Sequence, residues 1–278
     1  MSAPADNRPA HTIVPPSGWP LPDLRELWGY RDLVYFLARR DIAVRYRQTV
    51  IGAAWAIVQP VAFATVLGLF LTLFGRVPTE GVPYAVFALA GMSVWLFVSG
   101  SLSSTATSTV ASSALVRKVY FPRLVIPLAA IIPSIVDFLV ALVVLFVAMA
   151  IFGVAPSGNI VALPGVFLLA VLVAFGAGLW LSALVVRYRD IQHVVPFLVQ
   201  VGLFVSPVLY QLDLIPERFQ AVYSLNPMVG VLEGFRWAVL GTSPPGELLL
   251  IPLTVGALLL ISGLVFFTRA ETTFADEV

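Results

Sequence analysis

Long uncharged stretches alternate along this chain with short segments that carry the charged residues. Residues 48–75 and 81–116 contain no charged side chain, and residues 124–152 contain a single one, Asp137. A helix needs about 20 predominantly apolar residues to cross a hydrocarbon core of about 30 Å. We therefore expect the first three membrane-spanning helices to lie within these three stretches.

The second half of the chain continues the same pattern after a cluster of helix breakers. This cluster predicts a tight turn and consists of Gly153, Pro156, Gly158, Asn159 and Pro164. The sequence then predicts a fourth spanning helix that runs to about Val186, a fifth over about 191–210 and a sixth over about 248–268. The expected fold class is an all-α integral membrane protein with six transmembrane helices.

The segment 28–47 is amphipathic and too polar to cross a membrane. As a helix it places four apolar residues on one side: Leu33, Phe36, Leu37 and Val44. Arg31 and Arg39 point away from that side, and Arg40 and Arg47 can snorkel from its edge. This pattern predicts an interfacial amphipathic helix on the cytosolic face of the membrane.

The segment 211–246 is too apolar for a free loop, yet Pro216, Asn226 and Pro227 divide it into pieces too short to cross. Broken backbone at membrane depth is tolerated only where protein buries it. We therefore expect an outer re-entrant region of two short helices over about 211–242, between the fifth and sixth spans.

The positive residues orient this arrangement. With six spans, the two ends and the second and fourth loops share one side, which carries thirteen of the sixteen basic residues; the other side has only Arg76, Arg218 and Arg236. The side richer in Arg and Lys faces the cytosol. The prediction is a mostly irregular cytosolic tail over 1–27, a transmembrane domain over 48–268 and a second cytosolic tail over 269–278.

Composition supports a membrane protein and excludes several kinds of site. The mean hydropathy is +0.96 and only 11% of residues are charged, whereas soluble domains carry about 25%. There is no cysteine, and the only histidines are His11 and His193, so thiolate chemistry is excluded and a histidine metal site is disfavoured. The proline-rich N-terminus lacks the apolar run of a secretory signal. A net charge of +1 gives no indication of nucleic-acid binding.

The chain also lacks a nucleotide-binding loop. A P-loop needs lysine after a glycine-rich turn, but the only lysine, Lys118, follows Arg117. No nucleophile has a plausible base beside it, and no span contains a pair of carboxylates. The sequence therefore disfavours an enzyme and predicts no cofactor on this chain.

Five hydroxyl residues form a continuous stripe on the expected second helix: Ser101, Ser104, Thr105, Ser108 and Ser112. One interpretation is a wall that lines a hydrated passage for a hydroxyl-rich substrate. The other is helix packing, in which small hydroxyl residues allow close approach. The sequence leaves both open.

Asp137 is the one acidic residue within the expected spans. A carboxylate there is costly unless it faces the bundle interior or water. It either has a role in transport or forms a structural hydrogen bond, for example to Ser134, Gln59 or Gln200. The absence of a second such group favours the structural role.

A basic cluster precedes the first spanning helix: Arg39, Arg40, Arg45 and Arg47. Orientation of the chain and attraction to anionic lipids suffice to explain it. A sharper interpretation is capture of a pyrophosphate head group at the cytosolic surface, because arginine forks suit phosphate oxygens.

Four motifs, in order, resemble ABC-2-type permeases that export polysaccharides such as O-antigen and teichoic acid. They are LARRDIAVRYRQTVIGAAWAIVQP at 37–60, VRKVYFPRLVIP at 116–127, VVRYRDIQHVVPF at 185–197, and SPVLY at 206–210 followed by LNPMVGVLEGFRWAVLG at 225–241. The resemblance covers about residues 31–245.

The resemblance implies a homodimer that works with two copies of a separate ATPase subunit, which would bind ATP and Mg. A cytosolic coupling loop over about 111–123 would dock on the ATPase. The implied contacts are Arg117, Lys118, Tyr120, Phe121 and Arg123, with Arg187, Arg189 and Asp190. The helix at 28–47 would act as a gate near which a lipid-linked glycan gains access.

The function expected from these observations is export of a polyprenyl-linked polysaccharide across the bacterial cytoplasmic (inner) membrane. Ser101, Ser104, Thr105, Ser108 and Ser112 would belong to the substrate path. An ABC-2 exporter of a lipid or small molecule is the first alternative. A secondary transporter or a membrane enzyme is the second, and it depends only on Asp137.

Overall fold

The structure is a computed structural model and describes residues 24–47, 54–74, 79–246, 250–271 and 274. The regular elements of the described residues are all helices, as expected from the sequence. In order, they are α1 (Leu24–Gly29), α2 (Arg31–Arg47), α3 (Trp55–Phe74), α4 (Tyr84–Ala111), α5 (Ser113–Lys118), α6 (Val125–Ala130), α7 (Ile132–Ile151), η2 (Gly158–Ala162), α8 (Leu163–Arg187), α9 (Ile191–Val205), η3 (Leu212–Leu214), α10 (Glu217–Tyr223), α11 (Pro227–Leu240) and α12 (Leu250–Ala270).

Four helical segments of the described chain are long and apolar enough to cross a membrane: Tyr84–Ala111, Val125–Ile151, Gly158–Arg187 and Leu250–Ala270. The second joins α6 to α7, and the third joins η2 to α8. The chain is therefore a multi-pass helical membrane protein. α3 adds a 20-residue helix without a charged residue, and α9 is a shorter apolar helix of 15 residues.

The prediction of a fifth helix over 191–210 was wrong at its end, because α9 ends at Val205. Ser206 has an extended backbone and precedes Pro207, and a residue before proline is disfavoured in the helical conformation. The five residues 206–210 are therefore outside the helix, and their backbone groups need other partners.

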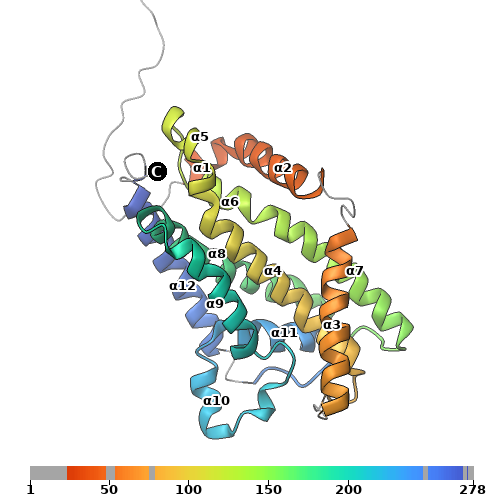
Figure 1. Ribbon diagram of the computed structural model, residues 1–278. Coiled ribbons are helices and arrows are strands. Elements are labelled where there is room, and N and C mark those ends of the chain that lie inside the picture. Colours follow the sequence, from red (N-terminus) through yellow and green to blue (C-terminus); the bar gives the residue numbers. More distant parts are fainter. Residues whose placement is uncertain (1–23, 48–53, 75–78, 247–249, 272–273, 275–278) are drawn as a thin grey trace, which may run out of the picture.

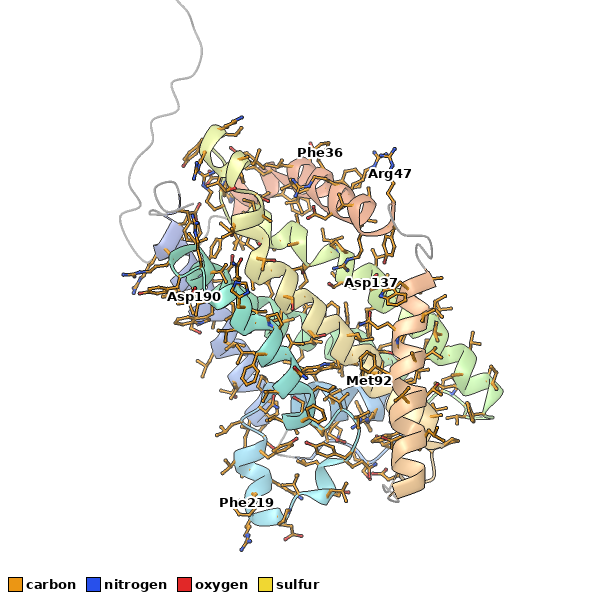
Figure 2. The ribbon with its side chains drawn as sticks, in the orientation of Figure 1. Phe36, Arg47, Met92, Asp137, Asp190 and Phe219 are labelled. Carbon is orange, nitrogen blue, oxygen red and sulfur yellow. The ribbon has the colours of Figure 1, made fainter. Side chains whose placement is uncertain are left out.

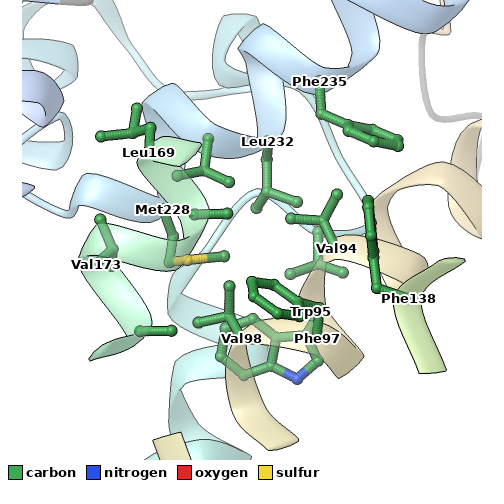
Figure 3. Close-up of a cluster of buried hydrophobic side chains, with 14 of the residues drawn as sticks. Val94, Trp95, Phe97, Val98, Phe138, Leu169, Val173, Met228, Leu232 and Phe235 are labelled. Carbon is green, nitrogen blue, oxygen red and sulfur yellow. The ribbon is translucent and has the colours of Figure 1, made fainter. Parts of the chain in front are cut away.

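α4 lies at the centre of the bundle and contacts α3, α7, α8 and α11. Its middle contributes four apolar side chains to the main core: Val94, Trp95, Phe97 and Val98. Figure 3 shows them packed against Phe138 of α7, Leu169 and Val173 of α8, and Met228, Leu232 and Phe235 of α11. The rings of Phe97 and Phe138 lie 5.6 Å apart. Packing around α4 thus joins elements from across the chain.

α8 and α12 approach each other closely through two glycines. A Cβ atom at Gly176 would lie 2.7 Å from the Leu260 backbone, and one at Gly263 would lie 2.5 Å from the carbonyl oxygen of Gly176. Small residues that allow such contact are typical of paired membrane helices. The Trp180 indole N–H donates to Ser262 Oγ across the same interface at 3.0 Å.

The two ends of the bundle differ in their elements (Figure 1). α1, α2, α5 and the C-terminal end of α12 gather at one end, which we call the inner end, and α10 lies at the opposite, outer end. α2 lies over α6 and the start of α7. These segments belong to the parts of the chain that were predicted to share one side of the membrane.

One side of α2 packs on the rest of the protein. Leu37 and Ala38 are buried, in a small second core with Val116, Phe121 and Val125. Leu33 and Val34 are partly buried against this cluster. Phe36 and Val44 are instead 66% and 68% exposed, so only part of the predicted apolar side packs on protein. The predicted contact of this helix with the membrane stays a prediction.

At the outer end, the chain breaks where the sequence predicted. α10 begins directly after Pro216, and α11 begins with Pro227 after the cap Asn226, whose Oδ1 accepts the N–H of Met228 at 3.0 Å. α11 is largely buried, whereas α10 has no buried residue. Protein therefore covers the longer of the two short helices.

Candidate functional site

Two cavities with both polar and apolar residues in their walls lie along one side of α4. The first, of about 380 Å³, lies between α2, α4 and α6. The second, of about 310 Å³, lies between α3, α4 and α7 and is lined by Asp137, Tyr46, Gln59 and Ser93 among others. Arg45, near the end of α2, lines both cavities. It therefore lies where the two cavities meet.

The hydroxyl stripe of α4 divides between the first cavity and the helix interfaces. Three of its residues line the cavity: Ser104, Ser108 and Ser112. Ser101 and Thr105 are instead fully buried, and their hydroxyls have no hydrogen-bond partner. Thr105 packs so closely on α8 that a Cβ atom at Gly178 would lie 2.7 Å from it. One stripe thus supplies both a cavity wall and a packing surface.

The cavity-lining hydroxyls are already oriented by the protein. Ser104 Oγ donates to the carbonyl oxygen of Ala130 at 2.9 Å, and Ser108 Oγ donates to that of Thr105 at 2.7 Å. A hydroxyl that donates once keeps acceptor capacity on its oxygen. These two serines can therefore accept hydrogen bonds from a hydroxyl-rich ligand.

Asp137 binds two residues from the end of α2. Its two carboxylate oxygens accept hydrogen bonds from the Arg45 guanidinium and the Tyr46 hydroxyl. The side chains of Arg45 and Asp137 are 37% and 32% exposed. Burial, followed by the hydrogen bond to Asp137, raises the pKa of Tyr46 to about 12, so Tyr46 keeps the proton that it donates. The partners of Asp137 thus lie on α2, and they are not those suggested by the sequence.

The four arginines of the predicted basic cluster have different surroundings. Arg40 lines the first cavity and pairs with Asp41 at 2.8 Å, and Arg45 pairs with Asp137. Arg39 and Arg47 are exposed. In Figure 2, Asp137 lies beneath the end of α2, and Arg47 points away from it. The structure therefore brings only Arg40 and Arg45 to the cavities.

The predicted coupling loop contains α5 and the turn that follows it. Arg117, Lys118 and Tyr120 are exposed at the inner end, Tyr120 by 67%. Phe121 is only 1% exposed and belongs to the second core under α2. Phe121 therefore anchors the turn to α2, in a position that does not offer the side chain to another protein.

Arg123 holds the same turn in place. Its guanidinium lies 5.2 Å from the centre of the Phe121 ring and donates to the carbonyl oxygen of Val119 at 3.1 Å. Its backbone N–H donates to Glu271 Oε1 at 2.8 Å. Burial raises the pKa of Glu271, and the contact with Arg123 opposes this shift. Sequence reasoning gave Glu271 no role, because nothing local links the C-terminus to this turn.

The second predicted contact region is the turn between α8 and α9. Arg187, Arg189 and Asp190 are all exposed there, and Figure 2 places Asp190 toward the inner end. The structure thus presents three charged side chains at the start of α9.

Arg236 was missed by the sequence reasoning, which counted it only as an outer basic residue. It is completely buried on α11. Its guanidinium donates to the carbonyl oxygens of Pro207 at 2.8 Å, Val208 at 2.6 Å and Tyr210 at 3.1 Å, and lies 3.8 Å from the centre of the Phe87 ring. These bonds satisfy the backbone beyond the end of α9. The available signal was an arginine three residues after Glu233 within a mainly apolar helix.

Within the part of the chain that the structure describes, no three His, Asp or Glu side chains are placed to hold a metal ion. What the arrangement offers is a line of hydroxyls, two arginines and two carboxylates, Asp41 and Asp137, along two neighbouring cavities. Such groups can bind polar and anionic ligands without catalysing a reaction.

Comparison with known proteins gives a consistent picture. The family model for ABC-2 type transporters matches residues 32–240. The chain is 27% identical to an O-antigen export system permease protein, RfbA of Klebsiella pneumoniae, over 88% of this chain and 94% of that protein. It is 28% identical to RfbA of Myxococcus xanthus over 92% and 98%, respectively. A polysialic acid transport protein, KpsM of Escherichia coli, is 26% identical over 72% of this chain and 78% of that protein.

Proposed function

Because the chain belongs to the ABC-2 type transporter family, we propose that it is the permease of an ATP-driven exporter that moves a polyprenyl-linked polysaccharide out of the cytosol. Family membership makes the chain the transmembrane, non-catalytic subunit and implies a partner ATPase. The polysaccharide is proposed because relatives over most of this chain are named for export of O-antigen and polysialic acid.

The proposed topology has six spans in the bacterial cytoplasmic membrane, with both termini in the cytosol. α3 and α9 supply the first and fifth spans beside the four longer segments. The non-helical residues 206–210 complete the fifth span, which is acceptable at membrane depth because α11 buries and bonds their carbonyls. The gathering of α2, α5 and the end of α12 at one end of the bundle supports this orientation.

The observation that carries the proposal is the pair of polar cavities along α4. Ser104, Ser108 and Ser112 line the first, and Ser93 and Gln59 line the second. Hydroxyls and amides form weak hydrogen bonds that water can replace, so a long hydroxyl-rich chain can slide past them without being held. In the proposed assembly, two copies of the chain pair and together enclose the path.

ATP and Mg are proposed to bind two copies of the partner ATPase. The exposed residues Arg117, Lys118 and Tyr120 form the main contact, and the second turn supports it with Arg187, Arg189 and Asp190. Phe121 and Arg123 support this contact indirectly, because they fix the turn to α2 and to Glu271 near the C-terminus. Movement of the ATPase would therefore reach α2 through a packed core.

Two alternatives have less support. Export of a lipid or small molecule fits the same family but not the names of these relatives. A secondary transporter depended on Asp137 as a proton carrier, and this carboxylate is engaged by Arg45 and Tyr46.

The test is a deletion of this chain in its own host. We expect the polysaccharide to accumulate inside the cell, and export to return when the intact chain is supplied. The purified chain alone should not hydrolyse ATP, whereas a complex with the ATPase subunit should. Normal surface polysaccharide in the deletion strain, or ATP hydrolysis by the chain alone, would refute the proposal.

A further inference from the structure

The Arg45–Asp137 pair lies at the junction of the two cavities. An anion that enters the first cavity meets Arg40 and Arg45 on its wall. Asp137 lines only the second cavity, on the far side of Arg45. Asp137 therefore binds the Arg45 guanidinium from the second cavity, which is the cavity toward which an exported substrate would move.

The pair has the chemistry of an exchangeable contact. Both side chains are about one-third exposed (37% and 32%), so a ligand can reach Arg45 from either cavity and Asp137 from the second. Asp137 presents two oxygens, one to Arg45 and one to Tyr46. A phosphate group also presents several acceptor oxygens, and arginine binds phosphate and carboxylate with the same donor geometry.

The first cavity offers an anionic group two guanidinium donors. Arg40 and Arg45 line its wall, whereas the hydroxyls of Ser104 and Ser108 already donate to carbonyl oxygens. Asp41 lines the same cavity and already accepts from Arg40, so each arginine is held by an acidic residue of the chain. A ligand must replace these acidic partners to bind.

We propose that Asp137 is an internal substitute for a phosphate-bearing head group. The carboxylate holds Arg45 while the path is empty, and the head group takes its place when a substrate is loaded. The inference rests on the proposed function and specifies its first binding step. Exchange also breaks the polar link between the end of α2 and α7, while Leu37 and Ala38 keep the rest of α2 on its core. The exchange therefore releases one end of α2 when substrate arrives.

Binding of a polyprenyl diphosphate to the purified chain in complex with its ATPase tests this inference. Asp137→Asn removes the competing charge and keeps an acceptor for Tyr46, so we expect the affinity to rise about tenfold. Arg45→Gln should lower it about tenfold, and the double variant should resemble Arg45→Gln, because the competitor matters only through Arg45.

The control variant is Arg39→Gln, an exposed arginine of the same helix that lines neither cavity; it should keep the affinity of the unmodified protein. Uncharged polyprenol should bind all variants equally. Competition by inorganic diphosphate distinguishes recognition of the phosphate alone from recognition of the lipid-linked head group.

Unchanged or reduced affinity in Asp137→Asn would overturn the inference and leave Asp137 a structural partner. Asp137→Ser provides a second variant if the asparagine protein does not fold. The proposed function is judged separately by the deletion strain. If that strain fails to export polysaccharide while Asp137→Asn binds the diphosphate normally, only this inference falls.

Discussion

Arginines at the two ends of this molecule bind their acceptors in contrasting environments. At the outer end, Arg236 is completely buried and donates to three backbone carbonyls and to Glu233. At the inner end, Arg45 is more than one-third exposed and pairs with Asp137. Arg236 thus donates mainly to backbone carbonyls. Arg45 instead binds a side chain, which in our proposal a ligand replaces.

The difference follows from the cost of a buried charge. A fully desolvated guanidinium is costly unless most of its donors are matched, and removing it leaves the matched groups unpaired. Among the described residues, Arg236 leaves only its Nε without a partner. A partly exposed pair gains little net stability, because water competes for both partners. The outer end is therefore built to hold its shape, and the inner end is built to change partners.

The largest expected effect is loss of the outer anchor. Arg236→Met should lower the free energy of unfolding by about 3–5 kcal/mol, because Pro207, Val208 and Tyr210 would keep buried carbonyls without partners. Titration with a denaturing detergent measures this. The matched control is Arg218→Met, an exposed arginine on α10, which should change stability by less than about 0.5 kcal/mol. Equal effects of the two substitutions would mean that Arg236 does not anchor this backbone.

The next largest effect is a difference in stability between substitutions of two adjacent aromatic residues at the inner end, Tyr120 and Phe121. Phe121→Ala should cost about 3 kcal/mol, because it opens a cavity in the small core under α2. Tyr120→Ala should leave stability nearly unchanged, since Tyr120 is 67% exposed, but should weaken association with the ATPase. Thermal unfolding and co-purification measure the two outcomes. Loss of ATPase binding only in Phe121→Ala would contradict the proposed contact.

A third test addresses the two roles of the hydroxyl stripe. Ser104→Leu with Ser108→Leu should strongly reduce export with the fold retained, because two apolar side chains would fill the first cavity. Thr105→Val, next to Ser104 but on the packed side of α4, should leave export intact, since the buried Thr105 hydroxyl has no partner among the described residues to lose. Export is followed by surface polysaccharide in cells with matched amounts of protein. Full export by the leucine variant would place the path elsewhere.

The sequence predicts well those features that local composition determines. Uncharged runs located the long helices, because the bilayer core demands about 20 apolar residues in succession. The breaks of the outer region followed from Pro216 and Pro227, whose rings restrict the backbone wherever they occur. Such features need no knowledge of neighbours in space.

Most of the features that the sequence did not predict depend on distant contacts. α9 ends at Val205, and the carbonyls beyond it are bonded by Arg236, whose burial is not visible in the local pattern. Asp137 finds its partners on α2, more than ninety positions earlier. Phe121 carries the same local signal as the exposed Tyr120 before it, and only the packing of α2 distinguishes them. Periodicity cannot select between partners that the fold brings together.

The smallest expected effect concerns the link between the coupling turn and the C-terminus. Burial raises the pKa of Glu271 above its ordinary value of 4.5, so the folded state holds the proton more tightly than the unfolded one. The resulting stabilisation is complete below the ordinary pKa and is lost as the pH rises through the raised pKa. Glu271→Gln keeps an acceptor for the Arg123 N–H and should remove this part of the pH dependence.

Melting temperatures of the purified chain between about pH 4 and about pH 8 test the role of Glu271. The unmodified protein should lose stability relative to Glu271→Gln as the pH rises, and Glu217→Gln, an exposed residue on α10, should follow the unmodified protein. A partly buried acid beside an exposed turn thus gives the inner end a weak, titratable contact, unlike the permanent one of Arg236. Parallel curves for Glu271→Gln and the unmodified protein would show that the carboxyl is equally solvated in the folded and unfolded chain, and would contradict this contribution of Glu271 to the pH dependence.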